Sequence, residues 1–282
     1  MAPSTDNTPT LVDCSPLQKE CMDQLGSPSL DSNSVPPPPA AAVRTSHSHP
    51  INVSWLIPHH ALVAPPSAGF DLDAFTSTLT STTPIGGRPQ LGNIGLSSCP
   101  GKQVRLDAAS AQAAMAGAGR QPVRRDLAVD LPRVAEMGVK LIVCCLYDEE
   151  LAYLGAPWDR YSSIANSLGI QVSRVPMIDG SVPMEQAPLE SALVAIHQQL
   201  AAGQHVLIHC RGGIGRAALV ACCYFLKHGW SGDDRAAIAH VRRMRSPRAI
   251  ETVQQESYLY QYWQQQRQAS PAGDGNANAA NR

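Results

Sequence analysis

The chain has 282 residues, which at ~150 residues per domain allows one domain with extensions or two small ones. Its formal charge is −1, from 22 basic and 23 acidic side chains, and this balance argues against a nucleic-acid or polyanion-binding protein. The longest uncharged apolar run, at 217–226, is much shorter than the ~20 residues that span a bilayer, so no membrane association is expected.

The two ends of the chain differ in composition from its middle. The first 50 residues contain no aromatic side chain and include the run Pro36–Pro39. A segment without large apolar side chains cannot bury enough surface to offset the entropy lost on ordering. We therefore expect a disordered Ser/Pro-rich head at 1–50, a folded domain at 51–268 and a flexible tail at 269–282.

The first third of the expected domain carries few structural signals. Residues 51–56 are typical of an edge strand. Residues 65–121 contain clusters of Gly, Ser and Pro, and an Ala-rich stretch at 108–119 fits a helix or a loop equally well.

From residue 123 onwards the hydrophobic pattern becomes regular. Continuous apolar runs predict buried strands at 141–146, 170–175 and 205–209. Apolar residues at helical spacing predict helices, which lie at 127–137, 149–168 (interrupted at Gly155 and Pro157), 185–202, 214–228, 233–245 and 249–266. Pro132 suggests that the regular part of the first helix begins only near Asp130. Strands alternating with helices predict an α/β fold with a central, mainly parallel sheet flanked by helices.

The segment after the strand at 205–209 has the composition of an anion-binding loop. Its sequence is His209-Cys210-Arg211-Gly212-Gly213-Ile214-Gly215-Arg216. The three glycines tolerate positive φ, so the N–H groups of the loop can converge on one point. The following helix adds unpaired N–H groups and a positive dipole end, and Arg216 adds a planar guanidinium that can hold two oxygens. We expect residues 211–216 to bind a phosphate group.

Cys210 lies at the base of this loop. Helix N-termini and nearby cations favour the thiolate form of a cysteine, so Cys210 is expected to be ionised at neutral pH. A nucleophile beside a bound phosphate implies phosphoryl transfer through a phosphocysteine intermediate. The alternative, a buried apolar thiol in a tight turn, is disfavoured by the three glycines and by Arg216.

The eight cysteines include no CxxC pair. The doublets at 144–145 and 222–223 lie in apolar stretches, which is typical of buried, reduced thiols. The first residues lack both a basic and an apolar region, so no secretory signal is expected. These features predict a cytoplasmic or nuclear protein without a bound metal.

Expulsion of a serine, threonine or tyrosine oxygen requires a general acid. Asp179, in the loop after the strand at 170–175, is the candidate, and Gly180 would allow this loop to move. A plain Asp-Gly turn is the alternative interpretation. Asp148 is a weaker candidate, because its neighbours Glu149 and Glu150 suggest the solvated start of a helix.

The pattern His209-Cys210-x5-Arg216 resembles the signature of cysteine-dependent protein tyrosine and dual-specificity phosphatases. Among these, the chain is most similar to the cyclin-dependent-kinase-associated phosphatase family, through blocks at 53–56, 100–101, 123–125, 176–180, 250–255 and 258–259. The resemblance implies a single phosphatase domain without metal or organic cofactor. It implies that Cys210 is the nucleophile, Arg216 the phosphate clamp and Asp179 the general acid. It also implies a phosphorylated protein substrate, for which a cyclin-dependent kinase is a candidate.

Two positions depart from the pattern of this family. Ala217 replaces the Ser or Thr whose hydroxyl steadies the leaving thiolate, as in the phosphatases of regenerating liver. The late motif resembles Gln-Thr-x-x-Gln, whose glutamines help to orient the attacking water. Here Glu251 replaces the first glutamine, and only Gln255 matches. A carboxylate near a phosphate is unfavourable unless it is turned away or protonated, so slow hydrolysis of the phosphocysteine is expected.

Two residues beside the nucleophile have supporting roles in this interpretation. His209 is expected to pack behind Cys210 and to hydrogen-bond the backbone. Arg211 either adds positive potential at the mouth of the site or is an ordinary solvated side chain.

The sequence therefore predicts a phosphatase acting on phosphotyrosine or phosphoserine/threonine residues in proteins. A phosphoprotein-binding module with weak or vestigial catalysis is the alternative, suggested by Ala217 and Glu251. A third hypothesis is a phosphatase of phosphoinositides or other small phosphates, for which Arg211 alone is weak support.

Overall fold

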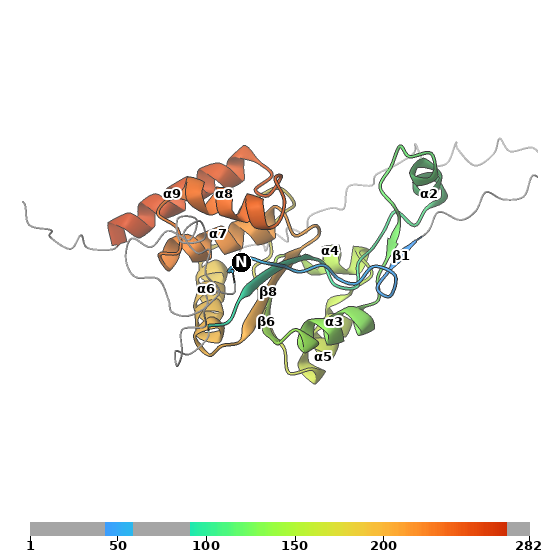
Figure 1. Cartoon of the computed structure of the whole chain (residues 1–282), viewed down its shortest axis with the longest axis horizontal. Coiled ribbons are helices and arrows are strands. Elements are labelled where there is room, and N and C mark those ends of the chain that lie inside the picture. The colour runs from blue at the N-terminus through green and yellow to red at the C-terminus, as the bar shows by residue number, and fades with distance from the viewer. Residues whose placement is uncertain (1–42, 59–90, 270–282) are drawn as a thin grey trace, which may run out of the picture. The chain divides into compact units, whose positions relative to one another are not determined.

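The computed structural model describes residues 43–58 and 91–269 (Figure 1). All of these residues belong to one structural unit, 40–282. No helix in this described part of the chain is long and apolar enough to cross a membrane.

A five-stranded sheet with the strand order β2-β3-β8-β6-β7 is the centre of the fold. Its strands are β2 (Ser54–Trp55), β3 (Ile94–Ser98), β8 (His205–Cys210), β6 (Val139–Cys144) and β7 (Gln171–Arg174). The strand β2 is antiparallel to β3, and every other neighbouring pair is parallel. This confirms the predicted α/β fold with a central, mainly parallel sheet, and it places the short strand near residue 55 at the sheet edge as predicted.

Helices cover both faces of this sheet, which explains why its central strands are continuous apolar runs. The helices are α3 (Leu127–Glu136), α4 (Asp148–Tyr153), α5 (Trp158–Ser167), α6 (Gln186–Ala201), α7 (Arg216–Lys227), α8 (Asp234–Met244) and α9 (Val253–Ala269). In Figure 1, α3 and α5 lie on one side of the sheet and α6, α7, α8 and α9 on the other. The helix α7 is surrounded by protein, and its residues 216–226 are all buried.

A second, three-stranded sheet has the order β1-β5-β4. It consists of β1 (Arg44–Thr45), β5 (Val123–Arg124) and β4 (Gln103–Val104), and the helix α2 (Ala108–Met115) follows β4. The strand β1 pairs in parallel with β5, although it lies far from it in the sequence.

Residues 43–50, which were expected to belong to the disordered head at 1–50, lie within the described part of the folded unit. Residues 43–50 are ordered, because β1 pairs with β5 and the buried Ser46 accepts a hydrogen bond from the Asp126 N–H at 2.9 Å. This segment is stabilised by partners elsewhere in the chain rather than by large apolar side chains of its own. The rest of the predicted head, 1–42, and the predicted tail at 270–282 lie outside the described residues.

Two further elements differ from the sequence-based expectation. The strand β3 lies inside the sheet between β2 and β8, within the stretch 65–121 for which only an uncertain helix was expected. The helix α3 begins at Leu127 rather than near residue 130, because the Asp126 carboxylate caps it by accepting a hydrogen bond from the Ala128 N–H at 3.0 Å. The cap offsets the hydrogen bond that Pro132 removes.

Candidate active site

The Cys loop, residues 210–216, connects the end of β8 to the start of α7. It therefore lies at the carboxyl end of a parallel strand, the edge at which open α/β sheets bind ligands. Cys210 is only 3% exposed, and the Gly213 N–H donates a hydrogen bond to its Sγ at 3.1 Å. An N–H aimed at this sulfur stabilises negative charge on it.

Gly213 is required by the path of the loop. Its φ is +74°, and an added Cβ would lie 2.1 Å from the carbonyl oxygen of Ser97 on β3. A side chain at this position is excluded by both backbone conformation and contact. The close packing of the loop against β3 is therefore a reason for one of the three glycines seen in the sequence.

Arg216 is 1% exposed and is held by two carboxylates and a carbonyl. Its Nη atoms donate to Glu150 at 2.6 and 2.9 Å and to the Met177 carbonyl at 2.9 Å, and Nη2 lies 2.9 Å from Asp179 Oδ1. Burial alone would lower the pKa of Arg216, but the hydrogen bonds with Glu150 and the nearby anionic groups raise it above its usual range. Its Nε is buried and has no partner in the described part of the chain.

Glu150 is a site residue that sequence reasoning missed. The run of three acidic residues at 148–150 suggested a solvated helix start, yet Glu150 is only partly exposed and its carboxylate is held by Arg216. The available signal was topological, because β6 neighbours β8 and both strands end at the same edge. Asp148, the rival acid, instead binds Arg174 at 2.7 Å.

Asp179 lies on the loop between β7 and α6 and is 60% exposed. Besides its contact with Arg216, it is 4.0 Å from Arg211 Nη1. The structure therefore brings Asp179 to the Cys loop, as the sequence predicts. Gly180 follows with a φ of +76°, and its carbonyl accepts a hydrogen bond from Thr252 Oγ1 at 2.8 Å.

Gln255 is buried where α9 meets the Asp179 loop. Its Nε2 donates to the Ser181 carbonyl at 3.0 Å, and its Oε1 accepts from the Glu251 N–H at 2.9 Å. Both ends of the amide thus fasten the loop to the start of α9, a positioning role that the sequence did not indicate. The expected role in orienting water stays a prediction.

Glu251 packs its carboxylate against the end of the Cys loop. A Cβ on Gly215 would lie 2.4 Å from Glu251 Oε2, which shows how closely the carboxylate approaches the loop backbone. Partial burial, with the neighbouring Asp179 charge, raises the pKa of Glu251, while Arg216 opposes the shift. The Glu251 carboxylate therefore faces the loop, and the positive charge of Arg216 offsets its negative charge only in part.

His209 is fully buried behind the Cys loop, as the sequence predicts. Its Nε2 lies 3.0 Å from the hydroxyl of Tyr161 on α5, and the two rings are stacked with centroids 5.7 Å apart. Burial lowers the pKa of His209 to about 3, so the ring is neutral at physiological pH. Like Glu150, Tyr161 is a residue of the site that no local sequence pattern indicated.

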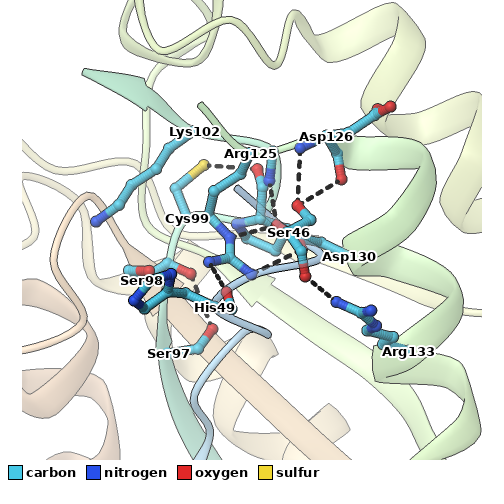
Figure 2. Close-up of polar contacts among 12 residues, drawn as sticks. Ser46, His49, Ser97, Ser98, Cys99, Lys102, Arg125, Asp126, Asp130 and Arg133 are labelled. Atoms are coloured by element: carbon cyan, nitrogen blue, oxygen red, sulfur yellow. Dashed lines mark hydrogen bonds and ion pairs between the residues drawn. The ribbon is translucent and has the colours of Figure 1, made fainter. Parts of the chain in front are cut away.

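Figure 2 shows a buried ion pair between Arg125 and Asp130, next to the turn that contacts the Cys loop. The Arg125 guanidinium binds Asp130 through two hydrogen bonds of 2.7 and 2.8 Å and the His49 carbonyl at 2.8 Å. Asp130 also accepts from the Gly101 N–H at 2.9 Å. This fixes the turn at 99–102, whose Cys99 N–H lies 3.5 Å from the carbonyl oxygen of the loop residue 211.

The family of the chain follows from comparison with known proteins. The family model described as "PTP-SAK: Swiss Army Knife protein, DSP-PTPase phosphatase domain" matches residues 113–259, about half of the chain. The protein therefore belongs to this family of dual-specificity phosphatase domains. The match includes β8, the Cys loop and α7.

Individual proteins that are similar to this chain include kinase-associated phosphatases. Cyclin-dependent kinase inhibitor 3 from Sus scrofa is 28% identical over 149 residues, which is 53% of this chain and 69% of the relative. The Homo sapiens protein of the same name has the same identity and coverage. The crystal structure of kinase associated phosphatase, with its catalytic cysteine replaced by serine, matches with a TM-score of 0.56 at 22% identity, over 78% of this chain and 97% of that one. The predicted resemblance to kinase-associated phosphatases is confirmed.

Proposed function

We propose that this protein is a phosphatase that hydrolyses phosphotyrosine or phosphoserine/threonine residues in proteins through a phosphocysteine on Cys210. The observation that carries the proposal is the Cys loop itself. It combines a buried sulfur that accepts an N–H with an arginine whose Nε has no protein partner in the described residues. No metal or organic cofactor takes part in this scheme.

Phosphate binding would use the free edge of Arg216. Glu150 and the Met177 carbonyl occupy Nη1 and one direction of Nη2, which leaves Nε and the donor that now contacts Asp179. A phosphate that binds these two donors would displace the Asp179 carboxylate from the guanidinium. Asp179 lies on an exposed loop, so it can shift toward the leaving oxygen.

The first chemical step transfers the phosphoryl group to sulfur. The Sγ of Cys210 attacks phosphorus, the S–P bond forms and the ester P–O bond breaks. The leaving oxygen takes a proton from the Asp179 carboxyl group. Arg216 and the N–H groups of the loop stabilise the charge on the phosphoryl oxygens.

In the second step, water attacks the phosphocysteine and the S–P bond breaks. Asp179, now ionised, accepts a proton from water, and Cys210 is regenerated as a thiolate. Gln255 would help to orient this water. Because Ala217 offers no hydroxyl to the departing sulfur and Glu251 adds negative charge at Gly215, this step is expected to limit turnover.

The proposed substrate is a phosphorylated protein, with a cyclin-dependent kinase as a candidate. Support comes from relatives at 28% identity that carry the name cyclin-dependent kinase inhibitor 3. A substrate of this kind would place the protein in the cytoplasm or nucleus.

The chemistry is tested with p-nitrophenyl phosphate and a panel of phosphopeptides. Wild-type protein is expected to hydrolyse both, and Cys210→Ser is expected to lose activity by at least about 10³-fold while trapping the preferred phosphopeptide. Cys222→Ala is the control, because burial raises the pKa of Cys222 and keeps it a thiol within α7. Equal inactivity of wild type and Cys210→Ser would contradict the proposal.

The alternative function is a phosphoprotein-binding module, which is suggested by Ala217 and by Glu251, the two departures expected to slow breakdown of the phosphocysteine. It predicts tight phosphopeptide binding with negligible turnover and no response to Ala217→Ser. If the protein is a phosphatase, Ala217→Ser is expected to raise the steady-state rate of phosphate release and to shorten the lifetime of the phosphocysteine. Measurement of the pre-steady-state burst separates the two functions.

A further inference from the structure

A cluster of basic side chains lies around Arg211, the residue that follows Cys210 in the Cys loop. Arg211, in the loop, has a 48% exposed side chain. Lys102, in the turn before β4, donates from Nζ to the Arg211 carbonyl at 3.3 Å. Arg105 and Arg120, at the two ends of the segment that contains α2, complete the cluster that we call the basic strip.

Close carboxylate partners of the strip are few, although the charge of Arg120 acts on Glu251. Arg105 donates its Nε and Nη2 to the Gln121 carbonyl at 3.2 and 3.1 Å, so it is oriented by a neutral group. Asp107, close by in sequence, accepts from the Ser110 N–H at 2.8 Å and caps α2. Within the described ranges, the one ion pair of the four strip cations is the 4.0 Å contact of Arg211 with Asp179.

Holding these cations together is unfavourable in the absence of a ligand. Burial, together with Arg105 and Arg125, lowers the pKa of Lys102 to about 8. Burial and the charges of Arg120, Arg211 and Arg44 lower the pKa of Arg105. The chain as a whole has a formal charge of −1, so the positive potential is local to this region.

The strip lies alongside the reacting sulfur. Lys102 donates a hydrogen bond to the carbonyl of Arg211, the residue after Cys210, and the charge of Cys210 affects the pKa of Lys102. The charge of Arg120 lowers the pKa of Glu251, whose carboxylate lies against Gly215 at the other end of the loop. The cations therefore extend along the Cys loop rather than lying on a remote surface.

We propose that Lys102, Arg105, Arg120 and Arg211 form a second anion-binding subsite, which holds a phosphate or carboxylate group next to the phosphorylated residue of a polypeptide substrate. This inference rests on the proposed phosphatase function and names the kind of protein substrate. The preferred substrate is a phosphopeptide with a second phosphate or an acidic side chain near the scissile phosphate.

The arrangement favours a polypeptide over a single compact headgroup. The four cations come from three separate segments, and their mutual influence continues through Arg105 to Arg44 on β1. Side chains of an extended polypeptide can contact such a strip at several points. A small polyphosphate would instead need the cations to converge on one enclosed pocket.

The test uses phosphopeptides of equal length that differ only beside the scissile phosphate, where they carry alanine, glutamate or phosphoserine. For wild-type protein, kcat/KM for the acidic peptides is expected to exceed that for the alanine peptide by about fivefold at low salt, and the ratio falls as salt screens the strip. In Arg105→Ala and Arg120→Ala the ratio is expected to approach one. Arg235→Ala, which removes an exposed arginine of α8, is the control and keeps the ratio.

Three outcomes overturn the inference. They are a wild-type ratio near one on peptides that are hydrolysed, a ratio unchanged by the strip variants, and an inositol bisphosphate that is preferred over every peptide. Hydrolysis of the alanine peptide tests the phosphatase function separately. If no peptide is hydrolysed, the ratio of dissociation constants of the acidic and alanine phosphopeptides for Cys210→Ser decides whether the subsite exists.

Discussion

At the scale of single residues, the Cys loop depends on backbone geometry as much as on side-chain chemistry. Gly213 points its N–H at the sulfur of Cys210, and this orientation requires a positive φ and contact with the Ser97 carbonyl. At Gly215 the nearest obstacle to a side chain is the flexible carboxylate of Glu251, which can move aside. Substitution of Gly213 should therefore disturb charge stabilisation in the loop even though no functional side chain is lost.

Gly213→Ala is expected to lower kcat/KM for p-nitrophenyl phosphate by about 10²-fold or more, because a donor aimed at the reacting centre is displaced. It is also expected to destabilise the fold by about 1–3 kcal/mol. Gly229→Ala is the matched control, since Gly229 also has a positive φ, of +68°, but nothing within 4 Å of an added Cβ. Its cost should be limited to backbone strain, about 1 kcal/mol, with activity retained. Equal activity in the two variants would refute the argument.

At the scale of elements, the turn at 99–102 connects the three-stranded sheet β1-β5-β4 to the active site. The Cys99 N–H and the Lys102 side chain of this turn both contact the Arg211 carbonyl, and the buried pair of Arg125 and Asp130 fixes the turn. Arg125 also binds the His49 carbonyl and thereby attaches the segment after β1. The segment after β1, which has few large apolar side chains, is thus held in place by the charged side chain of Arg125.

Asp130→Asn is expected to destabilise the protein by about 3–5 kcal/mol, because it leaves the buried Arg125 guanidinium without a compensating charge. Urea unfolding at pH 7 measures this loss. Arg160→Ala breaks the exposed pair with Asp126, whose partners are both about half exposed, and should cost only about 0–1 kcal/mol. Similar losses in the two variants would show that the Arg125–Asp130 pair does not support the fold as described.

At the scale of the whole molecule, stability should depend on pH through His209. Its pKa in the folded protein is about 3, below the ~6.5 of an unperturbed histidine, because the ring is fully buried. The unfolded chain therefore binds this proton at a higher pH than the folded protein does. The contribution of His209 to stability is therefore fully present above the unfolded pKa of ~6.5, and it is lost progressively as the pH falls from there toward the folded pKa of about 3.

We expect His209 to contribute a fall of up to ~1.4 kcal/mol per pH unit in the free energy of unfolding as the pH is lowered from about 6 to 4. Urea titrations across this range measure the slope. His209→Gln should remove that contribution, and Tyr161→Phe should lower stability at every pH by about 1–3 kcal/mol while keeping the slope, since it removes only the hydrogen-bond partner. Parallel curves for wild type and His209→Gln would contradict this assignment.

The distribution of charge also differs between the chain and the folded molecule. The overall balance of −1 argued against polyanionic partners, yet the fold brings Lys102 to the Arg211 carbonyl and Arg105 to the carbonyl of Gln121, the residue after Arg120. Composition averages over the surface, whereas a local potential depends on which cations the fold places side by side.

The sequence by itself determined the Cys loop and the class of fold. The nucleophile, the three glycines and Arg216 are contiguous between an apolar run and a helix, so local conformational rules were sufficient. The central strands beyond residue 123 were found for the same reason. The strand β3 was missed because Gly95 weakens the pattern, and this glycine is explained only by the Val53 side chain 2.4 Å from its absent Cβ.

Only the tertiary structure decided which residues surround that loop. Glu150 binds Arg216 from 66 positions away, Tyr161 reaches His209, and β1 is ordered by β5. These contacts depend on the order of strands in the sheet and on side chains that meet across it, and no spacing in the sequence encodes them. Local patterns specify a loop that can hold a phosphate, while the packing of distant segments decides which charges tune it and what lies beside it.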